Sequence, residues 1–198
     1  MDICVKCDQL VKCRTQIVYP TQSFGSEILA IGEAPGVEED TLGKGFVGIS
    51  GKNLDGLFNR INIAKDSYNK ANILRCRPPN NRKPTTKEID SCLPYLLEFI
   101  ITIKPKIILT VGSTAASIFC GKMPLSHIIK HQQQNYFRSN LYKESIHPLI
   151  QNTINITKYF ISIPHTSPLA FNRSNKDGIK WKEVSFQQIQ FLNDLIKE

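Results

Sequence analysis

The sequence has no long apolar run. Residues 1–14 form no hydrophobic stretch, and no segment approaches about 18 consecutive apolar residues, the length that a membrane-spanning helix needs. This argues against a secretory leader and a transmembrane helix, and we expect a cytoplasmic protein with no membrane partner. Internal repeats, heptads and long linkers are missing too. We therefore expect a single domain over residues 1–198 and, by default, a monomer.

Acidic residues are scarce relative to basic ones. The 198 residues include 17 Asp and Glu against 25 Lys and Arg, which gives a formal net charge of +8. A surplus of positive charge favours an anionic partner, and nucleic acid is the commonest. The apolar fraction of 41% and the charged fraction of 21% are ordinary for a soluble globular protein with a full hydrophobic core.

Disulfide bonds are not expected, because a reducing compartment favours metal binding or burial for the six cysteines. Two cysteines form a CxxC pair, one directly follows a predicted strand, and one lies in the next predicted helix. These candidate metal ligands are Cys4, Cys7, Cys76 and Cys92. Four thiolates suit either Zn²⁺ or a [4Fe–4S] cluster, and the residues alone do not distinguish the two. Cys13 is a rival ligand, and Cys120, at the end of an apolar helix, is expected in the core.

Apolar runs alternate with loops in a β-α-β manner. Buried strands are predicted at 27–32, 70–74, 106–111 and 159–163. Helices are predicted at 52–63, 112–119 and 181–196. A further helix should run from Thr85 or Thr86 to Ile103, with Glu88 completing a capping box. A glycine-rich loop fills 32–51, and the segment 123–157 is irregular, with a hairpin near 135–141.

Short apolar strands separated by helices predict an α/β fold of three layers, α/β/α, around a central, mainly parallel sheet. Ligands of such sheets bind beyond the carboxyl ends of the strands. Four predicted strand ends carry glycine or polar residues: Gly32 with the loop after it, Asn72, Gly112 with Ser113, and His165. These residues are the first candidates for a functional site.

Several ordered motifs lie at these strand ends. They read GEAPGVEED at 32–40, FVG at 46–48, and Asn72 followed by CRPP at 76–79 and NR at 81–82. With the CxxC pair and VGSTAA at 111–116, they resemble the iron–sulfur uracil-DNA glycosylases known as family 4, densely over residues 4–120 and again over 159–173. The resemblance implies the uracil-DNA glycosylase fold, DNA as the partner, and a [4Fe–4S] cluster on the four candidate cysteines.

The activity that this resemblance implies is hydrolysis of the N-glycosidic bond of uracil in DNA, which leaves an abasic site during base excision repair. Such an enzyme must flip the base out of the stack. Phe46 would stack on that base, and the Asn72 amide, with one donor and one acceptor group, would read its edge. The backbone of Gly32 and Glu33 would line the pocket. His165 would donate to O2 of the base, where negative charge grows as the bond breaks.

Two carboxylates are candidates for handling the attacking water. In several branches of the superfamily an Asp or Asn, two residues after the first glycine of the loop, orients this water. That position is Ala34 here, as in the iron–sulfur branch. Glu33 or Asp40 would then help with the water or with the positive charge that develops on the sugar. No lysine occupies a Schiff-base position, so no lyase activity is expected.

The segment 165–173, HTSPLAFNR, resembles the HPSPLS-x-x-R loop of the cluster-free uracil glycosylases more than the corresponding loop of family 4. In that loop a leucine wedges into the duplex where the base has left, and Leu169 would be this wedge. Ser113, Ser167 and the cation Arg173 would hold DNA phosphates.

Because the sequence departs from the family pattern at several positions, it does not determine which base is the substrate. Gly45 and Thr166 stand where the family has proline, and we expect a wider pocket wall and a looser His165 loop. The segment 123–157 matches poorly and is a candidate for an accessory DNA-binding or gating element. One alternative is the same chemistry on a deaminated purine or a bulky modified pyrimidine, as in defence against modified phage DNA. Another is a non-catalytic DNA-binding protein with a metal staple.

Overall fold

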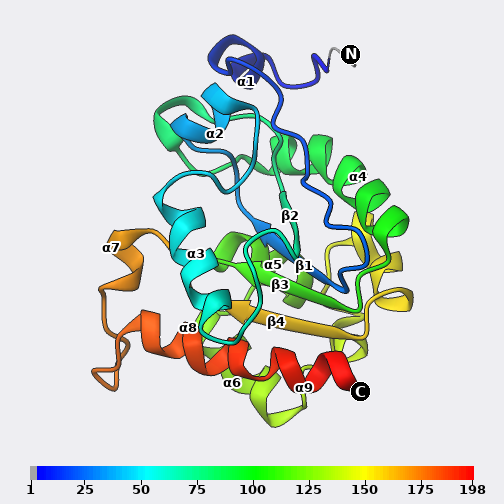
Figure 1. Cartoon of the computed structure of the whole chain (residues 1–198). Coiled ribbons are helices and arrows are strands. Elements are labelled where there is room, and N and C mark those ends of the chain that lie inside the picture. The colour runs from blue at the N-terminus through cyan, green and yellow to red at the C-terminus, as the bar shows by residue number, and fades with distance from the viewer. Residues whose placement is uncertain (1–3) are drawn as a thin grey trace.

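The structure is a computed structural model and describes residues 4–198 (Figure 1). Its centre is a four-stranded parallel sheet in the order β2-β1-β3-β4. The strands are β1 (Ile28–Gly32), β2 (Asn69–Asn72), β3 (Ile107–Val111) and β4 (Tyr159–Ile163). All four lie where the sequence predicts strands, and the predicted parallel sheet is confirmed.

Helices cover both faces of the sheet, which gives the expected three layers (Figure 1). One face carries α4 (Thr86–Ile103), α5 (Ser113–Cys120) and α6 (Leu125–Gln134). The other carries α3 (Ile49–Asn59), α8 (Trp181–Gln190) and α9 (Leu192–Lys197). Side chains alternate along a strand, so that Leu29 and Ile31 of β1 pack in one apolar core, and Ile28 and Ala30 in the other.

Helix α4 begins at the capping box that the sequence predicts. The hydroxyl of Thr85 accepts from the backbone N–H of Glu88 at 3.3 Å, and the Glu88 carboxylate accepts from the backbone N–H of Thr85 at 2.8 Å. The helix ends at Ile103, as predicted. These reciprocal bonds satisfy backbone donors that the first helical turn leaves free.

The sequence prediction misses several short helices. They are α1 (Asp8–Cys13), α2 (Val37–Leu42), α7 (Pro168–Phe171) and the 3₁₀ turn η1 (Pro79–Asn81). None exceeds six residues, which is too short to display an apolar period. The helix predicted at 181–196 is divided at Phe191 into α8 and α9. No helix of residues 4–198 is both long and apolar enough to cross a membrane.

The segment 123–157 is more ordered than its sequence suggests. It holds α6, followed by the 3₁₀ helices η2 (Ser139–Tyr142) and η3 (Pro148–Asn155). The hairpin expected near 135–141 is wrong. The chain turns there with Tyr136 and Phe137 at φ of 50° and 58°, and Arg138 forms an isolated bridge with Tyr159.

A buried glutamine explains where α6 lies. The side chain of Gln132 accepts from the backbone N–H of Ser162 at 2.8 Å and donates to the hydroxyl of Ser162 at 3.0 Å. Both residues are fully buried, so these bonds are costly to break. They fix α6 against β4, and thereby fix the whole outer edge of this helical layer.

Candidate functional site

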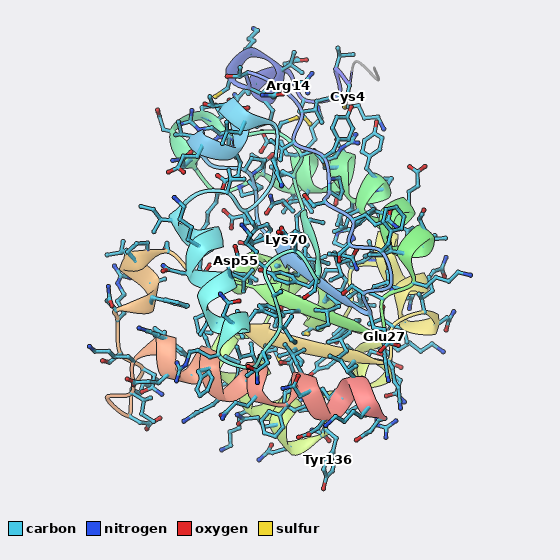
Figure 2. The ribbon with its side chains drawn as sticks, viewed as in Figure 1. Cys4, Arg14, Glu27, Asp55, Lys70 and Tyr136 are labelled. Carbon is cyan, nitrogen blue, oxygen red and sulfur yellow. The ribbon has the colours of Figure 1, made fainter. Side chains whose placement is uncertain are left out.

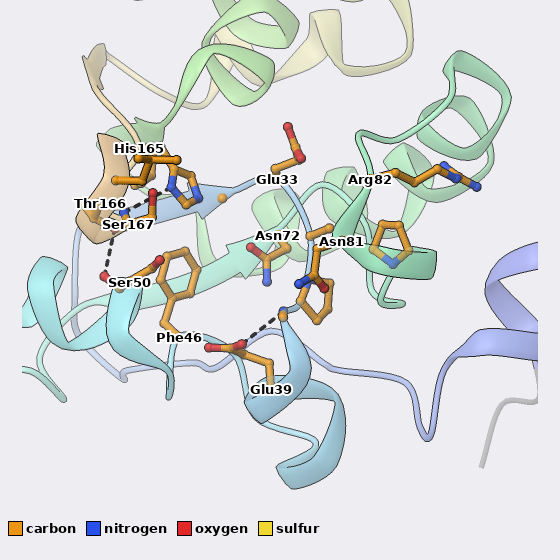
Figure 3. Close-up of a pocket in the computed structure, with 17 residues that line it drawn as sticks. Glu33, Glu39, Phe46, Ser50, Asn72, Asn81, Arg82, His165, Thr166 and Ser167 are labelled. Atoms are coloured by element: carbon orange, nitrogen blue, oxygen red, sulfur yellow. Dashed lines mark hydrogen bonds between the residues drawn. The ribbon is translucent and has the colours of Figure 1, made fainter. Parts of the chain in front are cut away.

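A cavity of about 600 Å³ opens at the carboxyl edge of the sheet (Figure 3). The strand register brings its walls together. Gly32 pairs with Asn72, and the backbone N–H of Gly112, just after β3, donates to the carbonyl of Ile163 at 2.8 Å. The residues predicted to bind the base or DNA that line this cavity are Gly32, Glu33, Phe46, Asn72, His165, Ser167 and Leu169. The strand ends therefore converge as their sequence positions predict.

The floor of the cavity depends on the missing side chain at Gly32. A Cβ atom there would lie 2.4 Å from Oδ1 of Asn72 and 2.9 Å from Cζ of Phe46. The absence of a side chain at Gly32 therefore lets the Asn72 amide and the Phe46 ring approach the end of β1. In the cavity beside them, a planar polar ring would meet an aromatic face and an amide with both donor and acceptor groups.

The ring of Phe46 is presented by a tightly folded turn. Phe46 has a φ of 58°, in the left-handed region that side chains other than glycine rarely adopt. Gly51, in the first turn of α3, lies against it, because a Cβ there would be 1.9 Å from the carbonyl oxygen of Phe46. Only glycine allows this approach, so the first turn of α3 determines the position of Phe46.

Glu39 is a site residue that sequence analysis missed. Its carboxylate accepts from the backbone N–H of Gly48 at 2.8 Å and from that of Gly36 at 3.0 Å, and it lines the cavity (Figure 3). It therefore joins the loop after β1 to the loop that carries Phe46. A signal was present in the sequence: an acidic residue three positions after Gly36 is typical of a capped helix start.

Asp40, predicted as a possible catalytic carboxylate, lies outside the cavity. Its side chain is buried and accepts from the backbone N–H of Thr15 at 2.9 Å and from that of Gln16 at 3.5 Å. Successive residues of a helix point about 100° apart, so Glu39 and Asp40 face different partners. Asp40 fixes the N-terminal segment rather than facing the cavity.

The predicted DNA-binding residues occupy the rim and its surroundings. Leu169, on α7, is 70% exposed at the cavity mouth, as a wedge would have to be. Ser167 caps α7 by accepting from the backbone N–H of Ala170 at 3.4 Å. Ser113 starts α5 and Arg173 follows α7; both are exposed, and neither lines the cavity.

His165 is held by its own loop. The backbone N–H of Ser167 donates to Nδ1 of His165 at 3.1 Å, which assigns the proton of the neutral ring to Nε2.

The expectation that Thr166 loosens this loop is wrong. Thr166 is fully buried, its hydroxyl donates to the carbonyl of Ser50 at 2.8 Å, and its carbonyl accepts from the Asn53 amide at 2.8 Å. The threonine hydroxyl ties the loop to α3, a bond that proline does not make.

The surroundings of His165 keep its ring neutral. Although part of the ring is open to the cavity, the protein packed around it makes the charged form costly and lowers the pKa of His165. The carboxylate of Glu33 opposes this by favouring the imidazolium. Glu33 itself accepts a hydrogen bond from the hydroxyl of Thr114. At neutral pH the ring is thus a hydrogen-bond donor through Nε2, with a carboxylate near it.

Arg82 contributes a cation to the cavity wall. It donates to the two carboxylate oxygens of Glu88 at 2.7 and 2.9 Å, and to the side chain of Gln9 at 2.9 Å. The hydrogen bond from Arg82 lowers the pKa of Glu88 to about 2. The guanidinium therefore links the start of α4 and helix α1 to the cavity wall.

Buried glycines shape the rest of the wall. Gly45, where the family has proline, is buried behind the cavity, and a Cβ there would lie 3.9 Å from Nδ2 of Asn72, an ordinary contact. Gly112 has a φ of 94°, and a Cβ there would lie 3.4 Å from the ring of His165. The absence of a side chain at Gly112 lets the end of β3 lie close to the imidazole of His165.

Two of the four candidate cysteine ligands contact one arginine. Figure 2 shows Cys4 and Arg14 together at one end of the molecule. Cys76 interacts electrostatically with each of the other three candidate ligands. Nη1 of Arg14 donates to Sγ of Cys76 at 3.0 Å, Nη2 donates to the carbonyl of Cys4 at 2.7 Å, and the backbone N–H of Arg75 donates to Sγ of Cys92 at 3.4 Å.

The chemistry of these donors fits a thiolate-bound metal group. As they stand, no three His, Cys, Asp or Glu side chains of residues 4–198 are positioned to hold a metal ion. The charges of Arg14 and Arg75 favour the thiolate of Cys76, and that of Arg75 favours the thiolate of Cys92, but burial outweighs them and raises the pKa of both thiols. Burial also raises the pKa of Cys7. Burial raises the pKa of Cys4, but hydrogen bonds from Lys6 and Tyr95 and the charge of Arg75 outweigh it, so the net pKa is lowered. Cys120 is fully buried in the core, as expected, and burial raises its pKa to about 12.

Residues 20–190 match the family described as the uracil DNA glycosylase superfamily. The chain is 44% identical over 121 residues to the type-4 uracil-DNA glycosylase of Saccharolobus solfataricus, a match that covers 61% of this chain and 56% of that protein. It is 41% identical over 113 residues to the type-4 enzyme of Archaeoglobus fulgidus, covering 57% and 56%. For the type-4 enzyme of Sulfurisphaera tokodaii the identity is 40% over 146 residues, covering 72% and 66%. The chain thus spans little more than half the length of the first two relatives.

We expect His165 to titrate below the ordinary range of an imidazole, because the charged ring is poorly solvated. Glu33→Gln removes the negative charge that favours the imidazolium, so it should lower the pKa of His165 further. An NMR titration of the imidazole resonances measures both values. Glu38→Gln, at an exposed carboxylate of the same loop, is the control and should leave the titration unchanged. An unshifted or raised pKa in either protein contradicts this account.

Proposed function

This chain belongs to the uracil DNA glycosylase superfamily, and on that premise we propose that it acts as a monomer on DNA and hydrolyses the N-glycosidic bond of uracil. The relatives compared above are named type-4 uracil-DNA glycosylases. The observation that carries the proposal is the meeting of Phe46, Asn72 and His165 around one cavity at the carboxyl edge of the sheet. Water is the second substrate, and the products are free uracil and an abasic site.

Base recognition follows from the walls of the cavity. A flipped pyrimidine would enter the cavity with one face on the Phe46 ring. The Asn72 amide would then meet the edge of the base, accepting from N3–H and donating to O4. Cytosine has an acceptor at N3 and a donor at position 4, so one orientation of the amide favours uracil over cytosine. Selectivity in this scheme comes from a fixed amide rather than from pocket size.

His165 would stabilise the departing base. As the glycosidic bond breaks, its electrons move onto the pyrimidine ring and negative charge grows on O2. A neutral imidazole with its proton on Nε2 donates to that oxygen and strengthens its bond as the charge develops. The hydrogen bond from Ser167 to Nδ1 supports this tautomer. A lowered pKa keeps the ring neutral, so the enzyme does not depend on imidazolium formation.

Glu33 is our candidate for the carboxylate that assists the water and the developing positive charge of the sugar. It lines the cavity beside His165, whereas the carboxylate of Asp40 is already engaged with backbone N–H groups. Thr114 holds the Glu33 side chain by a hydrogen bond. Ser113, Ser167 and Arg173 would bind phosphates on the rim, with Leu169 filling the gap that the flipped base leaves.

We further propose that Cys4, Cys7, Cys76 and Cys92 bind a [4Fe–4S] cluster, with Zn²⁺ as the alternative occupant. Such a group would cross-link the N-terminal segment, the loop after Asn72 and helix α4, and thereby stabilise the fold. The guanidinium of Arg14 would balance the negative charge of the thiolates. Iron, sulfide and zinc contents of the purified protein distinguish the two occupants.

Excision of uracil is the central prediction. On duplexes that carry uracil, hypoxanthine, xanthine or a modified cytosine, we expect base release at uracil, scored as strand cleavage after alkali. His165→Ala should lower the single-turnover rate by about 10²- to 10³-fold, as for other oxyanion donors. Asn72→Ala should lower it by about tenfold or more, since an unmade buried hydrogen bond costs roughly 1–3 kcal/mol.

His147→Ala is the control for these variants, because this histidine pairs with Asp90 at 3.1 Å and does not line the cavity. Its rate should equal that of the parent. Release of another base without release of uracil would change the proposed substrate and leave the proposed hydrolysis in place. Parental rates in both the His165 and Asn72 variants would support the non-catalytic alternative instead.

The glycines of α3 give a matched pair for the position of Phe46. Gly51→Ala forces the Phe46 carbonyl to move, and a displacement of about 1 Å can cost 100-fold in rate. Gly56→Ala, five residues along the same helix, meets open space and should stabilise the helix by roughly 0.5–1 kcal/mol. Thermal denaturation and single-turnover excision separate stability from activity. Equal rates in the two variants would show that Phe46 does not need this support.

Loss of a cysteine ligand should damage both stability and base recognition. Cys76→Ala should lower the bound iron content and the melting temperature, and it should also slow excision, because Asn72 precedes Cys76 by only four residues. Cys13→Ala is the control and should keep its full metal content. Metal analysis and thermal denaturation provide readouts that do not depend on activity. Full metal content and an unchanged melting temperature in Cys76→Ala would exclude this residue as a ligand.

A further inference from the structure

We propose that a groove beside the catalytic cavity binds an unpaired stretch of the target DNA strand. The groove has a volume of about 650 Å³ and lies between α6 and the start of α8. Its principal lining residues are Ile129, Lys130, Lys176, Ile179, Trp181 and Val184. We call it the Trp181 groove. The inference rests on the proposed action on DNA and adds a second contact region to it.

The floor of the Trp181 groove is apolar and contains an indole. Trp181 is half-buried and is the single tryptophan of the chain. Ile129 and Val184 are buried beneath the groove, while Ile179 keeps 39% of its surface exposed. An aromatic ring in a shallow apolar recess is a surface on which a nucleobase can stack, whatever its sequence.

Two cations stand around this floor. Lys130 comes from α6 and Lys176 from the loop before α8, and both are exposed. The acidic residue that lines the groove, Asp177, belongs to a local turn, in which Oδ2 accepts from the Asn175 amide at 3.4 Å. A stacking floor with a positive rim suits a strand whose bases turn inward and whose phosphates stay at the edge.

A short segment of the chain connects the mouth of the catalytic cavity to the groove. The backbone N–H of Trp181 donates to the carbonyl of Arg173 at 2.9 Å. Arg173 follows α7, about one helical turn beyond the exposed Leu169. Figure 1 shows α7 and the start of α8 on the same side of the molecule. We expect a DNA strand that leaves the cavity past Leu169 to follow this segment past Arg173 to the Trp181 groove.

The apolar floor favours an unpaired strand over a duplex. Stacked base pairs cover the faces of their bases and present phosphates outward, so a duplex could use the cations but not the indole. An unpaired base can leave its stack and cover Trp181, Ile129 and Val184. This assigns a function to α6, which belongs to the segment with the poorest family resemblance.

The emission of the single tryptophan reports on this groove directly. We would titrate the full chain with an oligonucleotide of ordinary bases, single-stranded or annealed to its complement, and record Trp181 fluorescence together with affinity by anisotropy. We expect strong quenching by the single strand and weaker quenching by the duplex. Trp181→Ala should weaken single-strand binding by about tenfold, whereas Trp181→Phe should keep most of the affinity because the ring remains.

Two charge-reversing substitutions test the lysines at the rim of the Trp181 groove. Lys130→Glu with Lys176→Glu should reduce the slope of log affinity against log salt by about 1.4, since each phosphate contact to a single strand contributes about 0.7. Lys104→Glu with Lys197→Glu makes the same change in net charge at the amino-terminal edge of the sheet and should leave the slope unchanged. Lys104 precedes β3, and Lys197 lies beside Glu198, which binds Tyr159 at the start of β4.

The outcomes separate this inference from the proposed activity. The proposal for the groove would be overturned if DNA did not quench Trp181 and Trp181→Ala bound DNA as the parent does. Uracil release by the parent would then leave the proposed activity intact. Quenching by DNA without release of any base would support the groove and refute the activity. Equal quenching by the duplex would overturn the assignment to an unpaired strand.

Discussion

The carboxylate of Glu39 is the interaction on which the site depends. It lies between the backbone N–H groups of Gly36 and Gly48, and so joins two loops that the sheet alone does not connect. One loop leaves β1 and carries Glu33; the other carries Phe46. A carboxylate that accepts from one buried and one half-buried backbone donor is hard to displace, because either donor would otherwise lose its partner. Without this link, the loop that carries Phe46 and the loop that leaves β1 would move independently.

Helix α2 extends this constraint toward the cysteines. Glu39 and Asp40 are neighbours on one short helix, yet one holds the cavity loops and the other holds the backbone of Thr15. Arg14, the residue before Thr15, contacts the sulfur of Cys76. The chain therefore connects the cysteine region to the cavity both through β2 and Asn72 and through α2. Stability and the shape of the cavity share these two connections.

Much of the architecture could be predicted from the sequence, for identifiable reasons. Short apolar runs mark β1, β3 and β4, and Thr85 with Glu88 marks the start of α4. Strand β2, with the sequence NKAN, is polar and is marked only by the apolar residues Ile73 and Leu74 that follow it. Because parallel strands end at one edge, the convergence of Gly32, Asn72 and His165 also followed from sequence position.

Other features could not be predicted, because they depend on contacts between distant segments. Two adjacent acids look alike in a sequence, and only the surroundings of α2 separate Glu39 from Asp40. Thr166 was expected to loosen its loop, but its hydroxyl meets the carbonyl of Ser50, more than a hundred positions earlier. The position of helix α6 depends on a buried amide, which bonds the backbone of a strand thirty positions later in the chain.

The first turn of α3 has a consequence for how the site tolerates thermal motion. Ser50 receives the hydroxyl of Thr166, next to His165, while the adjacent Gly51 supports the backbone of Phe46. The ring that would stack on a base and the ring that would donate a hydrogen bond are thus both held by neighbouring residues of one helix. When that helix shifts, both rings shift together, and the separation between them is preserved.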